Sequence, residues 1–454
     1  MASRQQIQPE WELPVFKEAH QLPDFRRDWY SVKFYPYTKP GDDSVFALVG
    51  GRHDDEDFYT CTWTKDPTNG KPLLCVAGSG ALIRIVDAIS GQLLRTLYGH
   101  GGEINDLAIC PTNPKILASA SEDLTVRIWS VDPAHENQPC AAILGGDGHN
   151  DKVLTIAFHE NGRYLLSGGA DGVINLWTLP AFPDENTGKN VPTLVHYPHF
   201  STQEIHQYIV DCVQFHDDLI LSKSDREDSI VLWSIAGFSS SSPIPDVLSA
   251  PTAHERQTST RSAFSPPALT DGAPLQYTRL LQFDIPEGDI VWMRFSLFPG
   301  TETTGPVLAF CNKFSKVSFW DLRRLEEYAS IISTPEKIKD PVLRPKFLNP
   351  YQRRQRGRGI IRGRRRSNSP TDSTASQRSG GDVAGTVDWE KSKAGWEMRY
   401  AMDDPLKDLA PHREEVVKGL DFCGRQAAWS PDGRWCVVVG SMGVWAVLQR
   451  WGNK

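Results

Sequence analysis

The sequence predicts an all-β protein built as a closed ring of repeated, four-stranded sheets. Three segments, SEDLTVRIW, GADGVINLW and REDSIVLW, close on a tryptophan, at Trp129, Trp177 and Trp233, and they recur at a spacing of roughly 50 residues. The first two follow a Gly-His pair, at His100 and His149, which leaves room for three short strands before the tryptophan. Because such a unit cannot bury its faces alone, we expect neighbouring units to stack into a ring whose loops bind a partner.

This pattern is typical of WD40 repeats, and it predicts a seven-bladed WD40 β-propeller. Alternating apolar residues and turn signals such as Asn161-Gly162 and Asp432-Gly433 support short strands. The segment around residues 11–16 is expected to supply the outer strand of the last blade and so remove the open edge. In chain order the candidate blades cover residues 28–50, 58–97, 103–143, 151–195, 207–237, 278–332 and 412–450.

The composition, with 39% hydrophobic and 23% charged residues, is that of an ordinary globular chain. The sequence has no apolar run of secretory or membrane-spanning length, so we expect an intracellular protein that does not cross a membrane. The cysteines lack paired short spacing, which predicts reduced thiols and argues against a zinc site; no metal and no cofactor are expected. The eight cysteines are Cys61, Cys75, Cys110, Cys140, Cys212, Cys311, Cys423 and Cys436.

Two insertions interrupt the repeat, at about residues 236–277 and 335–410. Both are rich in small polar or charged residues, and we expect them to be disordered low-complexity segments. The expected organisation is an N-terminal tail over residues 1–20 and a seven-bladed propeller over residues 21–454 that carries these insertions.

A basic arm of arginine and glycine covers residues 343–366 within the second insertion. It holds ten basic residues and no acidic one between Arg344 and Arg366, although the formal net charge of the whole chain is −7. Three interpretations stay open: contact with the phosphates of nucleic acid or a nucleosome, a nuclear-import signal, and a solvated linker. The arginines at the centre of the arm are Arg353, Arg354, Arg356, Arg358, Arg362, Arg364, Arg365 and Arg366.

Histidine, serine and aspartate recur together in spacings that could be mistaken for a nucleophile triad. We interpret them as a buried hydrogen-bond network that pins adjacent strands, because a single active site would not repeat from blade to blade. The expected protein is therefore not an enzyme. The sets are His100 with Ser119 or Ser121 and Asp123, and His149 with Asp171 and Trp177.

Six short strings stand out along the chain: FYTCTW, LLCVAGSGALIRI, YGHGGEIND, HFSTQEIHQYIVDCV, DLILSKS and DIVWMRFS. In collinear order they closely resemble the Esc/EED family, the WD-repeat subunits of polycomb repressive complex 2. The match covers about residues 28–235 and 278–325, with a weaker tail at 412–450. It is specific, because HFSTxxIHxxxVDCV and DIxxMRFS are not general features of WD40 repeats.

The resemblance implies a non-catalytic subunit of a histone H3 lysine methyltransferase complex that silences genes in the nucleus. Members of the family bind the trimethyl-lysine of the repressive mark at the mouth of the propeller and hold a helix of the methyltransferase on the opposite face. The implied partners are a SET-domain methyltransferase, a zinc-finger scaffold subunit and the methylated histone H3 tail. Binding the tail would activate the methyltransferase, which requires different affinities for two states of the complex.

A cage for trimethyl-lysine needs several aromatic rings at one rim, because a trimethylammonium group has no N–H to donate and is held by ring faces. The resemblance places cage positions at Phe34, in VKFYPY, and at Trp292, beside Val291. A third position falls on Leu97, so its neighbour Tyr98 would serve only if the loop register slips by one residue.

Three polar residues complete the expected site. Arg294 and Arg425 match arginines of the family and are expected to shape the pocket mouth or the channel, and Asp211 is a candidate for the peptide path.

The competing functional class is a substrate receptor of a cullin ubiquitin ligase. Its basis is Trp320-Asp321-Leu322-Arg323, a WDxR pattern that such receptors present to their adaptor and that also occurs by chance in many propellers. A third class, an RNA-binding scaffold, rests on the basic arm alone. The identity of co-purifying subunits would discriminate between these classes.

Overall fold

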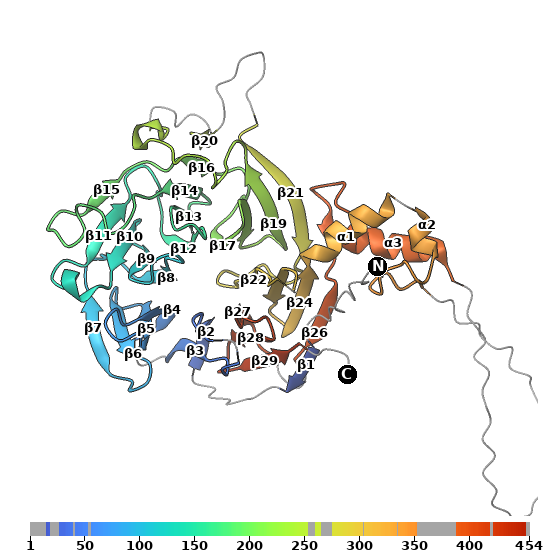
Figure 1. The fold of residues 1–454 in the computed structure, drawn as a ribbon, viewed down its shortest axis with the longest axis horizontal. Coiled ribbons are helices and arrows are strands. Elements are labelled where there is room, and N and C mark those ends of the chain that lie inside the picture. Colours follow the sequence, from blue (N-terminus) through green and yellow to red (C-terminus); the bar gives the residue numbers. More distant parts are fainter. Residues whose placement is uncertain are drawn as a thin grey trace, which may run out of the picture. The chain divides into compact units, whose positions relative to one another are not determined.

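The structure, a computed structural model, describes residues 15–18, 27–39, 41–52, 56–252, 259–264, 275–302, 304–333, 335–351, 387–417 and 421–450. The chain divides into two units, Met1–Glu326 with Met402–Lys454, and Glu327–Ala401. The first unit is a ring of β-sheets, which Figure 1 shows face on. The described residues of the second unit are mostly helical.

The described strands form six sheets of four or five strands and one two-stranded sheet. The first sheet in the chain pairs β2 (Arg27–Phe34) with β3 (Phe46–Arg52). The second holds β4 (Phe58–Lys65), β5 (Pro72–Gly78), β6 (Ile83–Asp87) and β7 (Leu93–Leu97). The third holds β8 (Ile104–Ile109), β9 (Ile116–Ser121), β10 (Val126–Ser130), β11 (Cys140–Leu144) and β15 (Thr193–Val195). The fourth holds β12 (Val153–Phe158), β13 (Tyr164–Gly169), β14 (Ile174–Thr178), β16 (Phe200–Thr202) and β20 (Thr260–Ser262).

The remaining three sheets contain the C-terminal part of the ring. One holds β17 (Val210–His216), β18 (Leu219–Ser224), β19 (Ser229–Ile235), β21 (Tyr277–Asp284) and β25 (Asp408–Leu409). The next holds β22 (Ser296–Phe298), β23 (Val307–Cys311), β24 (Lys316–Asp321) and β26 (Arg413–Val416). The last holds β27 (Gly424–Trp429), β28 (Trp435–Gly440), β29 (Trp445–Gln449) and β1 (Val15–Glu18).

The prediction of an all-β WD40 propeller is confirmed, but seven complete blades are not. The candidate blade at residues 28–50 is the β2–β3 pair, whereas the other sheets have four or five strands. The predicted N-terminal closure is confirmed, because β1 pairs antiparallel with β29 and places Val15 opposite Gln449. Strands from the two ends of the chain therefore share one sheet, which covers an edge that would otherwise be open.

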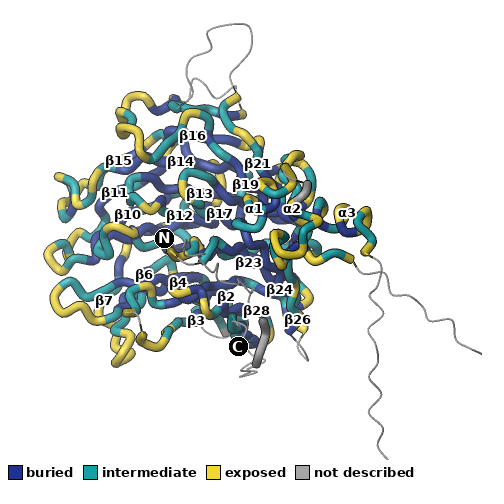
Figure 2. Tube along the Cα trace, turned by 45° about the vertical axis from the view of Figure 1, so that its right-hand side comes forward, coloured by how far each residue is buried: buried dark blue, intermediate teal, exposed yellow. Residues whose placement is uncertain are grey.

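The core lies between neighbouring sheets. The strands β2, β4, β8, β12, β17, β22 and β27 lie nearest the centre of the ring. From β22 through β27, β2, β4, β8 and β12 to β17, each of them contacts the next. Trp129 illustrates the packing between sheets: it is 1% exposed and belongs to one apolar cluster with Leu73 and Leu97 of the preceding sheet. In Figure 2 the strands of the ring are mostly buried, and the exposed segments are chiefly loops.

Three sheets contain the polar network that the sequence predicts in two. In the first, the ring of His100 bonds Asp123 at 2.8 Å and the Ser119 hydroxyl at 2.6 Å, and the Trp129 indole donates to the same hydroxyl at 2.8 Å. Ser119, and not Ser121, is thus the member of the network. A catalytic serine would have to be accessible to a substrate. Because these serines are buried, we interpret the sets as structural networks that hold adjacent strands together. The equivalent sets are His149, Asp171, Ser167 and Trp177, and His206, Glu227, Ser222 and Trp233.

The two insertions contain ordered elements, which corrects the expectation that they are disordered. The first holds β20 and the short 3-10 helix η2 (Val247–Ser249), and β20 pairs with β16. In the second unit, α2 (Pro335–Lys339) and α3 (Trp389–Tyr400) follow α1 (Leu322–Ile332). Tyr400 is buried, and its ring lies 5.6 Å from that of Tyr328 and 5.2 Å from that of Phe347. A few aromatic residues supply the apolar area that the average composition of the insertion hides.

The eight cysteines are free thiols, six of them buried. Within the described ranges, no helix has the length and apolar character needed to cross a membrane. The short 3-10 helix η1 (Pro133–His135) completes the described elements.

Candidate functional site

Six innermost strands share one irregularity near their first residues. In each, the pairing with the next strand of the sheet skips a single residue, which is a β-bulge. A bulge leaves the extra residue unpaired in the ladder and re-aims its side chain. Because the innermost strands surround the centre of the ring, the six bulges place six residues at the same end of the ring. The skipped residues are Tyr30 of β2, Tyr59 of β4, Asn105 of β8, Leu154 of β12, Asp211 of β17 and Arg425 of β27.

Two of these bulge residues are aromatic and touch each other. The rings of Tyr30 and Tyr59 meet edge to face, with centroids 5.7 Å apart and planes at 85°. Both residues are only partly buried, so their rings remain open to a ligand. Burial, together with the charges of Asp57 and Asp28, raises the pKa of Tyr30. Burial and a hydrogen bond with Glu103 raise the pKa of Tyr59 far above its usual range. The two rings are therefore neutral and have acidic neighbours.

Trp292 lies in the loop before β22, and its backbone is in the left-handed region, with φ of 70°. For a residue with a large side chain this conformation costs on the order of 1–3 kcal/mol and persists only where the surroundings fix it. Its N–H donates to the Asp211 carboxylate at 2.7 Å, and the Arg294 guanidinium lies 5.6 Å from the ring centroid. The indole is half-buried. Local strain at a half-exposed aromatic is typical of a binding site.

Arg425 connects the tryptophan loop to the tyrosines. Its guanidinium donates to the Val291 carbonyl at 3.3 Å, and its charge acts on the Tyr30 hydroxyl. Trp292, Arg425 and the Tyr30–Tyr59 pair thus lie at the same end of the ring. Half-exposed aromatic rings with Asp28, Asp57 and Glu103 nearby provide what a cation needs, namely ring faces and a negative field.

Arg294 lies below this rim and not at its mouth. The residue is 9% exposed; its guanidinium pairs with Asp106 at 2.9 Å and donates to the carbonyls of the bulge residues Asn105 and Leu154 at 3.1 and 2.8 Å. Its own N–H donates to the Arg425 carbonyl at 2.8 Å. Arg294 therefore ties four sheets together at the floor of the site. This position does not fit the pocket mouth, and a role at the channel stays a prediction.

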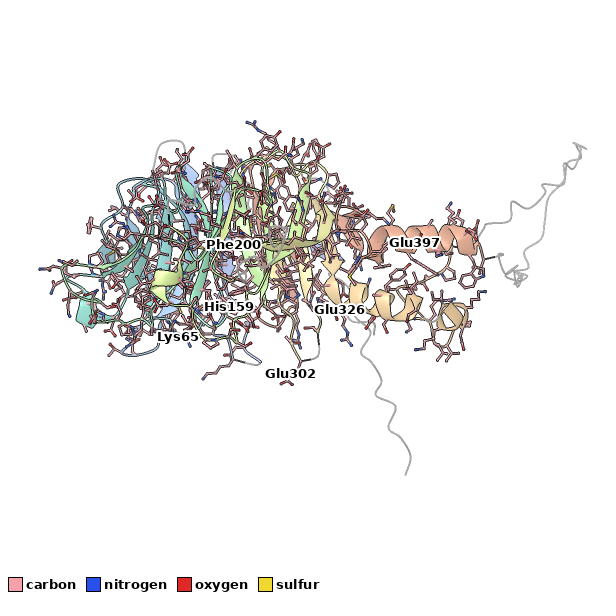
Figure 3. The ribbon with its side chains drawn as sticks, turned by 90° about the horizontal axis from the view of Figure 1, so that it is seen from above. Lys65, His159, Phe200, Glu302, Glu326 and Glu397 are labelled. Atoms are coloured by element: carbon pink, nitrogen blue, oxygen red, sulfur yellow. The ribbon has the colours of Figure 1, made fainter. Side chains whose placement is uncertain are left out.

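The structure does not bring Phe34 together with Trp292. Phe34 ends β2, four residues after Tyr30, and a strand advances by about 3.3 Å per residue, so the backbone positions of the two residues lie up to about 13 Å apart along the strand. Phe34 is 8% exposed and packs against Phe46 at 5.3 Å. In Figure 3, Lys65 at the end of β4 and His159 after β12 lie toward one side of the ring, which is the side where these strands end. Phe34 is thus a core residue at the wrong end for the cage.

Tyr98 also lies away from the candidate site. It follows β7, the outer strand of its sheet, and it is 69% exposed. Leu97, the position that the family resemblance indicates, is buried in the apolar cluster of that sheet. An outer strand cannot reach the rim formed by the innermost strands, so a slip of the loop register would not place Tyr98 in a cage.

Asp211 is fully buried and pairs with Lys223, whose Nζ lies 3.3 Å from both carboxylate oxygens. A peptide cannot reach this carboxylate directly, so its expected place on the peptide path is corrected. The arginines of the basic arm from Arg353 to Arg366 lie outside the described residues.

The WDxR segment is largely built into the fold. Trp320 is fully buried and its indole donates to the Leu409 carbonyl at 3.0 Å. Asp321 is 5% exposed and pairs with Arg324 at 3.2 Å. A tryptophan and an aspartate in these roles offer little to an adaptor protein.

Sequence reasoning missed Tyr30, Tyr59 and Lys223. The string FYTCTW already contains Tyr59, and DLILSKS contains Lys223. Nothing in a two-residue alternation marks a bulge, since the bulge reverses the face that the alternation predicts. The available signal for Tyr30 and Tyr59 was their shared position, one tyrosine near the start of each of two innermost strands.

Comparison with known proteins finds a WD-repeat family model and two polycomb proteins that are similar to this chain. The family model "WD domain, G-beta repeat" matches residues 91–130 and 139–178. The polycomb protein EED of Chaetomium thermophilum is 37% identical over 98% of this chain and 97% of its own length. The polycomb protein esc of Drosophila melanogaster is 32% identical over 64% of each chain.

Solved structures give the same result. A chain in the crystal structure of an active polycomb repressive complex 2 in the basal state superposes with a TM-score of 0.82 at 37% identity, covering 97% of this chain and 98% of that chain. A chain in the structure of the Chaetomium complex with H3K27me3 and H3K27M has a TM-score of 0.82 at 38% identity, with the same coverage.

Proposed function

This chain belongs to the family of the polycomb proteins EED and esc, and from that premise we propose that it is a non-catalytic subunit of a polycomb-type histone H3 lysine methyltransferase complex. It binds the trimethyl-lysine of the repressive mark, scaffolds and activates the methyltransferase, and so maintains gene silencing. The observation that carries this proposal is the group of half-exposed aromatics, Tyr30, Tyr59 and Trp292, at one rim of the ring. The related Chaetomium complex has been solved with H3K27me3.

The proposed cage consists of Tyr30, Tyr59 and Trp292, with Arg425 at its edge. A trimethylammonium group is large, weakly hydrated and unable to donate a hydrogen bond, so aromatic faces hold it by cation–π attraction of about 0.5 to 2 kcal/mol per contact. Asp28, Asp57 and Glu103 add a negative field that favours any cation. An unmodified lysine gains less, because its ammonium must shed tightly bound water that ring faces do not replace.

Activation follows from thermodynamic linkage between binding of the histone tail and the conformation of the complex. If the complex has a more active state in which the tail binds more tightly, then binding the tail increases the population of that state. The product of the methyltransferase would thereby stimulate further methylation nearby. The propeller contributes the binding energy, and the SET-domain subunit carries out the chemistry.

Four finer features belong to the same proposal. The β2–β3 pair fills the place of a seventh blade, because β2 contacts both β4 and β27. The partners are a SET-domain methyltransferase and a zinc-finger scaffold subunit, and the protein acts in the nucleus. The basic arm contacts nucleosomal DNA or RNA, since a run of arginines without acidic residues releases counterions from phosphates.

The test of assembly is affinity purification of the tagged full-length chain from its native cells. We expect a SET-domain methyltransferase and a zinc-finger subunit among the co-purifying proteins. Recovery of a cullin adaptor without any methyltransferase would instead favour the ubiquitin-ligase receptor. Recovery of methyltransferase subunits by a Trp292→Ala variant serves as the control that assembly does not depend on the cage.

A further inference from the structure

A buried ion pair lies directly behind the tryptophan loop. Lys223 of β18 and Asp211 of β17 are both fully buried, and the ammonium lies 3.3 Å from each carboxylate oxygen. Removing two charges from water costs about as much as their attraction returns, so such a pair is weak evidence of a role in stability alone. A well-packed apolar pair at these positions would serve the core equally well. The charges therefore call for another explanation.

Both members of the pair bond to the backbone of the tryptophan loop. The Asp211 carboxylate accepts the N–H of Trp292 at 2.7 Å, and the Lys223 ammonium donates to the carbonyl of Ile290 at 3.4 Å. These two bonds fix the backbone on both sides of Val291. The same ammonium donates to the Ser224 carbonyl at 3.3 Å, which anchors it to its own strand.

The backbone that these two bonds hold is in a conformation that needs stabilising contacts. Trp292 has a φ of 70°, which residues with a side chain rarely adopt unless their surroundings impose it. Without the acceptor at Asp211, its N–H would lack its partner and the left-handed conformation would lose an anchor. The backbone conformation sets the direction of the Cα–Cβ bond, so a change in that conformation would move the indole relative to Tyr30 and Tyr59.

We infer that Asp211 and Lys223 are positioning residues that hold Trp292 in the orientation needed for trimethyl-lysine, and so set the discrimination between methylated and unmethylated tails. This inference rests on the proposed function, because Trp292 acts here as a cage wall. Neither residue touches the ligand. Asp211 acts through the N–H of Trp292, and Lys223 acts by fixing the Asp211 carboxylate and the Ile290 carbonyl.

The test compares two double variants of the full-length chain that both remove the buried charges. D211N/K223M keeps an oxygen that accepts the N–H of Trp292, whereas D211L/K223M removes the acceptor and leaves apolar groups of similar size. Calorimetric titration with trimethylated and unmethylated H3K27 peptides gives the ratio of the two affinities, and thermal unfolding reports stability. We expect D211N/K223M to stay within about threefold of the wild-type ratio and D211L/K223M to lose about five- to thirty-fold of it, with similar melting temperatures.

The outcomes separate the inference from the proposed function. A selective wild type with an equally selective D211L/K223M would overturn the positioning role and leave the cage intact. Equal affinities of the wild-type protein for the two peptides would overturn the proposed function and, with it, this inference. Should D211L/K223M fail to fold, D211A/K223M, which needs no extra space, takes its place under the same criteria.

Discussion

The ring of Tyr30 meets the ring of Tyr59 edge to face, with centroids 5.7 Å apart, although the two residues lie on different sheets. Each is the extra residue of a β-bulge near the start of its strand. The contact exists because two neighbouring innermost strands carry the same irregularity at the same height. The proposed cage thus depends on backbone register as much as on residue type.

The first prediction concerns a matched pair of tyrosines. Tyr59→Ala removes a cage wall and should cost ~1 to 2 kcal/mol of binding, about five- to thirty-fold in affinity, for a trimethylated H3K27 peptide. Tyr98→Ala should leave both affinities unchanged, because Tyr98 is exposed and follows the outer strand β7. Calorimetric titration of both variants with methylated and unmethylated peptides provides the comparison. A loss of selectivity in Tyr98→Ala alone would restore the slipped-register hypothesis.

Phe34 gives a second prediction, on stability. Phe34→Ala should lower the free energy of unfolding by about 3 kcal/mol, because the ring is buried in a core cluster with Val32 and Val437. The protein that remains folded should retain its preference for trimethyl-lysine. Chemical denaturation measures the first quantity and peptide titration the second. Loss of selectivity without loss of stability would place Phe34 in the cage after all.

The third prediction concerns pH. Burial lowers the pKa of His100, and the attraction of Asp123 offsets this only in part. A group whose pKa is lower in the folded state contributes stability that is present above its unfolded value and lost as the pH falls. The free energy of unfolding should therefore decrease as the pH falls below about 6.5, the usual value for histidine.

A second group in the same network extends that loss to lower pH. Burial raises the pKa of Asp123, but its hydrogen bonds from His100, Thr125 and Gly101 outweigh burial and hold it well below its usual range. The contribution of Asp123 is present above about pH 3.9 and is lost below that value.

Urea denaturation at about pH 7.5 and about pH 5.5 measures the contribution of His100 separately, because Asp123 stays ionised at both values. In a His100→Gln variant the free energy of unfolding should change less between these two pH values than in the wild type. An equal change in both proteins would assign the pH dependence to other groups.

The fourth prediction concerns the basic arm. Replacing its eight central arginines with serine should weaken nucleosome or RNA binding and flatten its salt dependence, since each phosphate contact in B-DNA contributes about 0.9 to the slope of log K against log salt. Binding titrations at several salt concentrations measure the slope, and thermal unfolding should be unaffected. Unchanged binding at low salt would leave import or a passive linker as the role of the arm.

Much of the fold can be predicted from the sequence because WD40 sheets repeat local patterns. The tryptophans at the ends of strands, the histidine networks and the closing strand near Val15 all follow from residue types at regular spacing. The helix at Trp389–Tyr400 could not be predicted from composition. Its buried Trp396 and Tyr400 are outweighed by the polar residues around them when the segment is averaged.

The candidate site was harder to predict, and the reason is geometric. Trp292 follows from the resemblance alone, but its neighbours depend on which end of each strand faces the rim. Phe34 and Tyr30 lie on the same strand, and only the ring arrangement shows that Tyr30 is at the correct end. Lys223 could not be predicted because a lysine in a strand is usually solvated.

The pairing of β1 with β29 also determines when the ring can be completed during synthesis. Val15 is made long before its partner Gln449. A growing chain can therefore fold several sheets while β1 is still unpaired. Ribosome stalling, early termination or a frameshift before β29 is made would leave an open sheet edge, which invites pairing with other chains. Quality control of the nascent protein thus depends on synthesis of the segment that contains β29.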